Sequence, residues 1–161
     1  MNKFKYLKRG LVIPLIIFCL SLSSIITVQA KSFNEWIYTI YDENGNIIES
    51  GKTISNDDER QSWGSQTLKP NQMVVFQFSD SSDGMLDPDD VVTISYTLDR
   101  VAKHMVRISH LSTYTDYDFT LRSNTFTYKA EAPFRTGYAF ALKNKSLDSI
   151  KLEYFSVILE N

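Results

Sequence analysis

The chain has 161 residues, of which 43% are hydrophobic and 22% are charged, with a formal net charge of −2. This length suits one domain with a sizeable buried core. The acidic balance excludes nucleic acid as the main partner, and the single cysteine excludes an internal disulfide framework.

Residues 1–30 have the three parts of a cleavable secretory signal. Four basic residues precede an apolar run over residues 11–26, and Val28-Gln29-Ala30 places small residues where a signal peptidase reads them. The run is shorter than the about 20 apolar residues of a spanning helix. We therefore expect residues 1–30 to be removed, with a bacterial, secreted product and no stable membrane insertion after cleavage.

Cleavage leaves residues 31–161 as a single domain. Cys19 is lost with the signal, so the mature chain has no cysteine for a disulfide or a thiolate metal site. The signal holds four of the 17 basic side chains and none of the 19 acidic ones, so the mature domain has a net charge of −6. This domain must therefore be held together by its core alone.

The first half of the domain predicts strands separated by turns. Residues 36–41 carry large apolar side chains at both odd and even positions, so both faces of this strand are apolar. Asn44-Gly45 then predicts a type I′ hairpin turn, in which both central residues have positive φ. Asn56 is a candidate cap for a short helical turn near residues 57–63. Residues 74–78 alternate between apolar and polar side chains, as in a half-buried strand.

The second half continues this alternation over residues 92–98, 126–128 and 138–142. Turns are expected at Asp99-Arg100, at Ser123-Asn124 and over residues 144–149. Over residues 150–159 the apolar side chains first occupy every second position and, after Tyr154, also the positions between, which predicts a bulge there. The segments 36–41 and 150–159 are expected to be neighbours in the sheet centre.

About nine short strands with frequent turns predict an all-β fold. The architecture that we expect is a two-layer antiparallel β-sandwich of jelly-roll type.

Residues 80–90 form an acidic stretch between two predicted strands. Five carboxylates in eleven residues resemble the oxygen ligands of Ca²⁺, but their spacing fits no calcium motif, and ordinary turn chemistry is the favoured interpretation. Calcium is the one ion that this stretch suggests, and no other cofactor is expected. The candidate ligands are Asp80, Asp83, Asp87, Asp89 and Asp90.

The two histidines lie on the same face of one predicted strand, about 20 Å apart. His104 and His110 are therefore too distant to share a metal ion or to act as a pair, and we expect both at the margin of the core. The sequence contains no nucleophile elbow, zinc-protease helix or phosphate-binding glycine loop.

Aromatic residues in polar segments are the candidate ligand contacts. Trp63, Tyr114 and Tyr117 are expected in loops, where they either stack on sugar rings or cover the ends of the core. Asp116 and Asp118 lie beside them and can accept hydrogen bonds from hydroxyl groups.

These observations predict a secreted, non-catalytic binding protein that acts at the cell surface or in the medium, with a glycan as the first ligand to test and a protein as the other. The alternatives are a small secreted hydrolase and a secreted toxin or antagonist of neighbouring cells.

Overall fold

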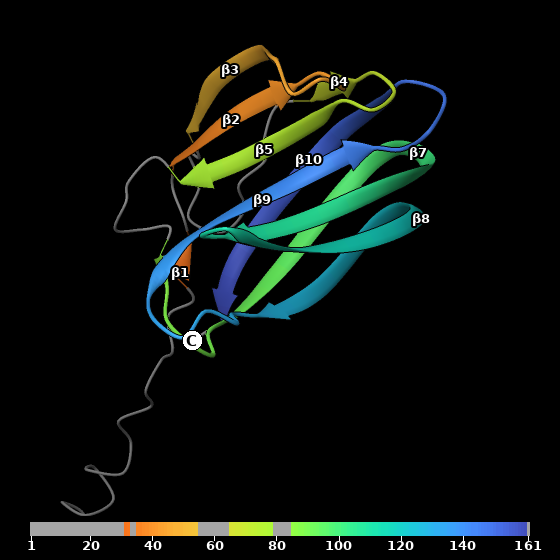
Figure 1. Ribbon diagram of the computed structural model, residues 1–161. Coiled ribbons are helices and arrows are strands. Elements are labelled where there is room, and N and C mark those ends of the chain that lie inside the picture. Colours follow the sequence, from red (N-terminus) through yellow and green to blue (C-terminus); the bar gives the residue numbers. More distant parts are fainter. Residues whose placement is uncertain (1–30, 33–34, 55–64, 79–84, 161) are drawn as a thin grey trace, which may run out of the picture.

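The computed structural model describes residues 31–32, 35–54, 65–78 and 85–160, and every regular element within these ranges is a β-strand (Figure 1). The described part of the chain contains no helix that could cross a membrane. The predicted signal and the predicted helical turn near 57–63 lie outside these ranges. The strands are β1 (Lys31–Ser32), β2 (Glu35–Tyr41), β3 (Ile47–Ile54), β4 (Gln66–Leu68), β5 (Met73–Phe78), β6 (Met85–Leu86), β7 (Val91–His110), β8 (Thr113–Lys129), β9 (Thr136–Asn144) and β10 (Ile150–Glu160).

The strands form one curled antiparallel sheet whose two halves face each other as layers (Figure 1). The first layer contains β1 and β4 beside β10, then the first half of β7 and the second half of β8. The second layer runs β3–β2–β5–β9, then the second half of β7 and the first half of β8. The prediction of an all-β sandwich is confirmed, and of the strands described β7 and β8 are the longest.

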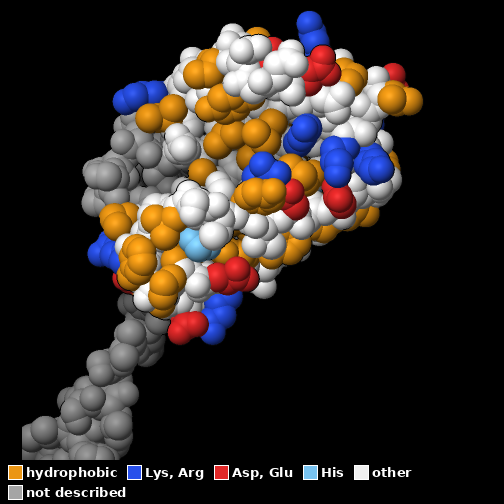
Figure 2. All heavy atoms as spheres, in the orientation of Figure 1, with side chains coloured by type: hydrophobic (Ala, Val, Ile, Leu, Met, Phe, Trp, Pro, Cys, Tyr) orange, Lys and Arg blue, Asp and Glu red, His pale blue; other side chains and the backbone are white. Residues whose placement is uncertain are grey.

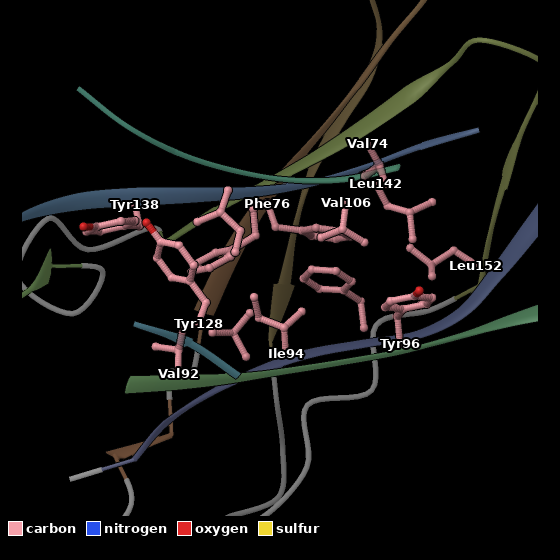
Figure 3. Packing of buried hydrophobic residues seen from close by; sticks show 14 of the residues in the cluster. Val74, Phe76, Val92, Ile94, Tyr96, Val106, Tyr128, Tyr138, Leu142 and Leu152 are labelled. Carbon is pink, nitrogen blue, oxygen red and sulfur yellow. The ribbon is translucent and has the colours of Figure 1, made fainter. Parts of the chain in front are cut away.

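The core lies between the layers and is built from the alternation that the sequence shows. Val92, Ile94 and Tyr96 point inward from the first layer and meet Val74, Phe76 and other side chains of the second (Figure 3). The rings of Phe76 and Phe155 stack with centroids 4.4 Å apart, joining β5 to β10. Burial of such apolar surface is the main force that holds the two layers together.

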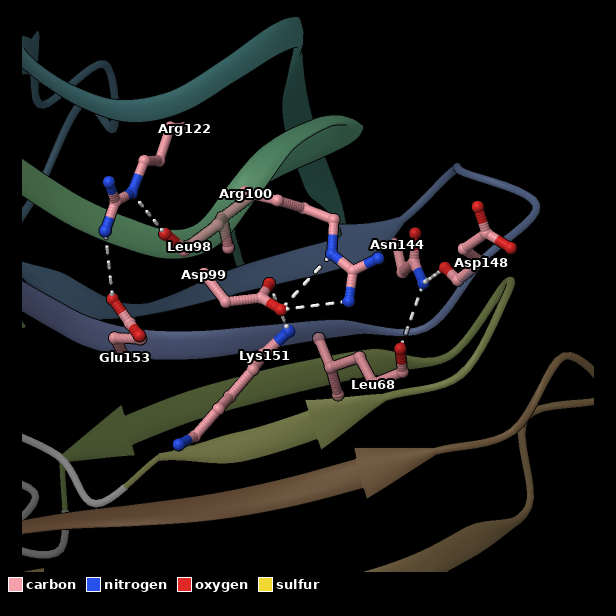
Figure 4. A network of polar contacts seen from close by, with 9 residues as sticks. All are labelled: Leu68, Leu98, Asp99, Arg100, Arg122, Asn144, Asp148, Lys151 and Glu153. Atoms are coloured by element: carbon pink, nitrogen blue, oxygen red, sulfur yellow. Dashed lines mark hydrogen bonds and ion pairs between the residues drawn. The ribbon is translucent and has the colours of Figure 1, made fainter.

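The hairpin of β7 and β8 passes from one layer into the other at a bend. The pairing register shifts between Thr97 and Ala102, and both strands continue through the bend. The predicted turns at Asp99-Arg100 and Ser123-Asn124 are therefore wrong, because polar residues there mark a bend within continuous strands. Arg122 supports the bend by donating a hydrogen bond to the Leu98 carbonyl (Figure 4).

The turn between β2 and β3 is a hairpin as predicted, but its type differs. Gly45 has a φ of 83° and Asn44 has no positive φ, which excludes a type I′ turn. Instead, the Asp42 carboxylate accepts hydrogen bonds from the backbone N–H groups of Asn44 and Asn46, at 2.9 and 2.8 Å. Asp42 therefore fixes a longer loop, as Asp commonly does in turns.

Two predictions about the last strand have opposite outcomes. The bulge near Tyr154 is confirmed by a register shift between Leu152 and Tyr154. The expected pairing of the segments 36–41 and 150–159 is wrong: β2 pairs with β3 and β5, whereas β10 pairs with β1, β4 and β7 in the opposite layer. Apolar side chains on both faces of two strands are therefore not evidence that the two strands are neighbours in a sheet.

A buried asparagine joins the loops at one end of the sandwich. The Asn144 carboxamide donates hydrogen bonds to the carbonyls of Leu68 and Asp148, at 2.9 and 2.8 Å (Figure 4). Its oxygen accepts hydrogen bonds from the backbone N–H and the hydroxyl of Ser146, both at 2.8 Å. This side chain thereby fixes the β9–β10 loop, which the sequence predicts at 144–149, against β4.

Candidate functional site

The sequence-predicted ligand residues near position 116 lie on β8, and the strand divides them between its two faces. Tyr114, Asp116 and Asp118 point outward from the second layer, whereas Tyr117 points inward. The Tyr117 ring packs against Phe126, with centroids 5.3 Å apart. The segment is thus a strand where a loop was expected, and Trp63 lies outside the described residues.

Three side chains form a connected unit on this outer face. Arg107 of β7 is directly opposite Asp116 and binds its carboxylate with two hydrogen bonds, Nε–Oδ1 at 2.7 Å and Nη2–Oδ2 at 2.9 Å. The Arg107 guanidinium also lies over the Tyr114 ring, 4.0 Å from its centroid. Two-point pairing and cation–π contact both restrict side-chain motion, so the exposed Tyr114 ring is held in place.

The same unit sets the charge state of its ionisable groups. The hydrogen bond from Arg107, followed by the attraction of its charge, holds the pKa of Asp116 below its usual value despite partial burial. The hydrogen bond to Asp116 in turn raises the pKa of Arg107. Both groups are therefore ionised at neutral pH.

Tyr114 and Arg107 border a groove of about 540 Å³ on the outer face of the second layer. We call it the Tyr114 groove. Its middle consists of small side chains from adjacent strands, Val75, Ala141 and Ser109. Figure 2 shows apolar side chains in the middle of this face, with basic and acidic side chains gathered to one side. The complete lining is Tyr41, Asp42, Glu43, Gly45, Asn71, Met73, Val75, Arg107, Ser109, Leu111, Ser112, Thr113, Tyr114, Ala141 and Lys143.

A second groove, of about 750 Å³, lies on the outer face of the first layer. We call it the hydroxyl groove, because its lining includes Ser95, Thr97, Ser123, Thr125, Tyr154 and Ser156. These hydroxyls largely satisfy one another: Ser95 bonds Thr125 at 3.0 Å, and Tyr154 donates to Ser156 at 2.8 Å. Because four of these six hydroxyls already bond one another, this face is the weaker candidate for a ligand.

The described part of the acidic stretch forms a turn with internal hydrogen bonds. The Asp90 carboxylate accepts a hydrogen bond from the Asp87 N–H at 2.8 Å, and Asp89 pairs with Lys129 at 2.8 Å. Asp80 and Asp83 lie outside the described residues. Among the residues described, no three His, Cys, Asp or Glu side chains gather as metal ligands do. The calcium site stays a prediction.

The two histidines share one face of β7, as predicted, but differ in burial. His104 is fully buried, so its expected place at the margin of the core is wrong. Its Nε2 lies 2.6 Å from the Tyr96 hydroxyl, and its Nδ1 lies 2.8 Å from the Ala102 carbonyl. The bend of β7 folds Tyr96 back over His104, which the alternation pattern alone does not reveal. His110 is partly exposed beside Tyr138, with ring centroids 4.8 Å apart.

Sequence reasoning missed Arg107, Tyr41 and Lys143 as groove residues. Arg107 was assigned to a strand, but no partner was identified for it. A hairpin loop recognised at residues 111–112 would have paired Arg107 with Asp116, since paired residues in an antiparallel hairpin are equidistant from the turn. No local signal in the sequence places Tyr41 or Lys143 on the same face as this pair.

No protein-family model matches the sequence, and no curated protein matches it. Among solved structures, the family GH115 4-O-methyl-α-glucuronidase BtGH115A, with specificity for decorated arabinogalactans, is 9% identical, with a TM-score of 0.42 over 79% of this chain and 17% of that one. The CBM22-1 and GH10 modules of Clostridium thermocellum xylanase 10B, complexed with xylohexaose, are 10% identical, with a TM-score of 0.41 over 83% of this chain and 28% of that one.

A variant of a family 29 carbohydrate-binding module, complexed with cellulohexaose, is 12% identical, with a TM-score of 0.41 over 83% of this chain and 93% of that one. This chain therefore spans less than a third of the first two proteins and most of the third. At these identities the likeness concerns the arrangement of strands alone.

Proposed function

We propose that the protein is a secreted, non-catalytic glycan-binding protein and that the Tyr114 groove is its binding site. The observation that carries this proposal is the exposed Tyr114 ring, which is 61% exposed yet held by Arg107. An exposed aromatic ring that is already fixed loses little conformational freedom when a ligand stacks on it. The predicted signal over residues 1–30 supports the extracellular setting.

The groove offers the two kinds of contact that a sugar needs. A pyranose ring has apolar faces of C–H groups, which pack on aromatic rings, and an equator of hydroxyls, which require hydrogen-bonding partners. Tyr114 and Tyr41 supply rings, and Asn71, Ser109 and Lys143 supply polar groups around a floor of small side chains. Such a concave surface with a few polar groups is typical of a ligand site.

The same face supports binding rather than hydrolysis. Glycoside hydrolysis commonly uses two carboxyl groups, one of them protonated so that it can act as a general acid. Asp116 is ionised and bound by Arg107, and Asp118 pairs with Lys145 at 2.8 Å. His104 is fully buried and lines neither groove.

The experiment is a glycan array probed with the protein recovered from the culture medium, followed by titration calorimetry on each glycan that binds. We expect Tyr114→Ala to weaken binding about fivefold or more, taking for sugar stacking the about 1–3 kcal/mol that a nucleobase gains on an aromatic side chain. Tyr154→Ala, in the hydroxyl groove, is the matched control and should change affinity less than twofold. The reverse pattern assigns the ligand to the hydroxyl groove and overturns the site; an array without any binding overturns the function.

Secretion is tested on the same material. The N-terminal sequence of the protein in the medium should begin at Lys31, directly after the predicted cleavage site. A product that stays with the cells and retains residues 1–30 contradicts both the cleavage and the extracellular setting.

A further inference from the structure

One end of the Tyr114 groove carries more positive than negative charge. Four cations, Lys103, Arg107, Lys143 and Lys145, share this outer face with the carboxylates of Asp116 and Asp118. Arg107 pairs with Asp116 and Lys145 with Asp118. Within the described residues, Lys103 and Lys143 have no ion pair, so this face carries two cations beyond those that its carboxylates bind.

Lys143 lines the groove itself and has no ion pair among the described residues, although its charge helps to lower the pKa of the nearby Asp116. It is a diagonal neighbour of Arg107 across β9 and β7, because Lys143 pairs with Met105 and Ala141 pairs with Arg107. Diagonal neighbours of this kind are about 7–8 Å apart at the backbone, within reach of long side chains. The two Arg107 nitrogens that bind Asp116 are Nε and Nη2, which leaves Nη1 as a further donor.

The two acidic residues that line the groove lie in the loop after Tyr41, two strands away from Lys143. The Asp42 carboxylate is occupied by its own turn, where it accepts hydrogen bonds from Asn44 and from the backbone and side chain of Asn46. Glu43 lies next to it in the exposed hairpin loop. The groove thus has an acidic loop, a neutral floor and a cationic end at Arg107 and Lys143.

We propose that the groove selects acidic glycans, with the negative substituent of the sugar, a carboxylate or a sulfate, bound between Lys143 and Arg107. This inference rests on the proposed glycan-binding function and names its ligand class. Guanidinium and ammonium groups form charge-assisted hydrogen bonds with such oxyanions. Tyr41 lies in the same cross-strand row as Lys143, two strands away, which is about 10 Å. A sugar on Tyr41 and an acidic sugar at Lys143 can therefore belong to one chain.

The test compares pairs of polymers that differ in charge alone: polygalacturonate with its methyl ester, and dextran sulfate with dextran. We expect the protein to bind the charged member of at least one pair about tenfold more tightly or better, and Lys143→Gln to remove about tenfold of that affinity. Lys151→Gln, which removes an exposed lysine of β10 in the other layer, is the control and should change affinity less than twofold.

Each other outcome identifies what has failed. Binding to neutral polymers only, with no effect of Lys143→Gln, overturns the acidic selectivity and leaves the proposed function intact. Equal losses for Lys143→Gln and Lys151→Gln indicate general charge attraction and also overturn it. Absence of binding to any charged or neutral glycan overturns the proposed function itself.

A measurement on the unaltered protein supplements the variants. Raising the salt from about 0.05 M to about 0.5 M shortens the range of charge attraction about threefold. Binding to the charged polymer should then weaken several-fold, while binding to a neutral glycan on Tyr114 should change little. Salt-independent binding of the charged polymer contradicts an ion-pairing role for Lys143.

Discussion

Replacement of Tyr96 by Phe tests how the buried His104 is held. Nδ1 of His104 lies 2.8 Å from the Ala102 carbonyl and must therefore donate a proton to it, which leaves Nε2 as an acceptor for the Tyr96 hydroxyl at 2.6 Å. Tyr96→Phe keeps the ring and its packing but leaves Nε2 buried without this partner. A buried polar atom deprived of its hydrogen bond costs about 1–3 kcal/mol. We expect the free energy of unfolding to fall by that amount.

The same geometry predicts how stability depends on pH. Burial lowers the pKa of His104 from its usual 6.5, an effect that the bond to Ala102 offsets in part. Below pH 6.5 the unfolded chain therefore takes up a proton that the folded protein does not. Stability decreases as pH falls, by up to about 1.4 kcal/mol per pH unit, until the lowered pKa is reached.

Urea unfolding followed by tryptophan fluorescence between pH 7.5 and pH 5.0 measures both effects. This range lies above the region in which Asp99 and Asp116 titrate, because their pKa values are lowered from 3.8. His104→Leu should lose the pH dependence, whatever its absolute stability. If the slope persists in His104→Leu, or if Tyr96→Phe leaves the free energy of unfolding unchanged, the assignment of a neutral, hydrogen-bonded His104 is wrong.

Three further changes test other parts of the fold. Asn144→Ala should lower the free energy of unfolding by about 3 kcal/mol in urea titration, because it leaves the carbonyls of Leu68 and Asp148 without this donor; an effect below about 1 kcal/mol contradicts this role. Gly51→Ala should destabilise by up to about 1 kcal/mol, since its Cβ would lie 2.7 Å from the far end of the Tyr38 side chain, which would have to shift away from Glu49, and an unchanged melting temperature would contradict the close contact. Millimolar Ca²⁺ should leave the melting temperature unchanged, because Asp89 already pairs with Lys129; a rise of several degrees would instead support the predicted calcium site.

The sequence predicts the fold class because the alternation of apolar and polar residues along a strand shows directly which side chains are buried. Ile94 and Tyr96 are buried where Thr93 and Ser95 are not, as the pattern indicates. The bulge at Tyr154 is readable for the same reason, since an extra residue inverts the parity of the side chains that follow. These features depend only on residues close together in the chain.

The candidate site is harder to predict because it depends on register between strands. Tyr114 and Asp116 are identified from the sequence as ligand candidates, but the partner that fixes them, Arg107, requires the β7–β8 pairing. Lys143 requires the additional pairing of β9 with β7, between segments that the whole of β8 separates in the chain. A one-residue error in either register would place the charged side chains on the opposite face.

The long β7–β8 hairpin explains why one strand serves both the core and the proposed site. His104 and Tyr117 are among its side chains that face the core, and Arg107 and Tyr114 are among those that face outward and line the groove. Because the inward side chains are locked by packing and by the Tyr96 hydroxyl, the backbone beneath the outward ones is held at a fixed register. Rigidity of the groove is therefore a consequence of core packing on the other side of the same strands. A core variant such as Tyr96→Phe should then weaken ligand binding only to the extent that it loosens the hairpin, whereas Tyr114→Ala should abolish stacking in a protein of unchanged stability.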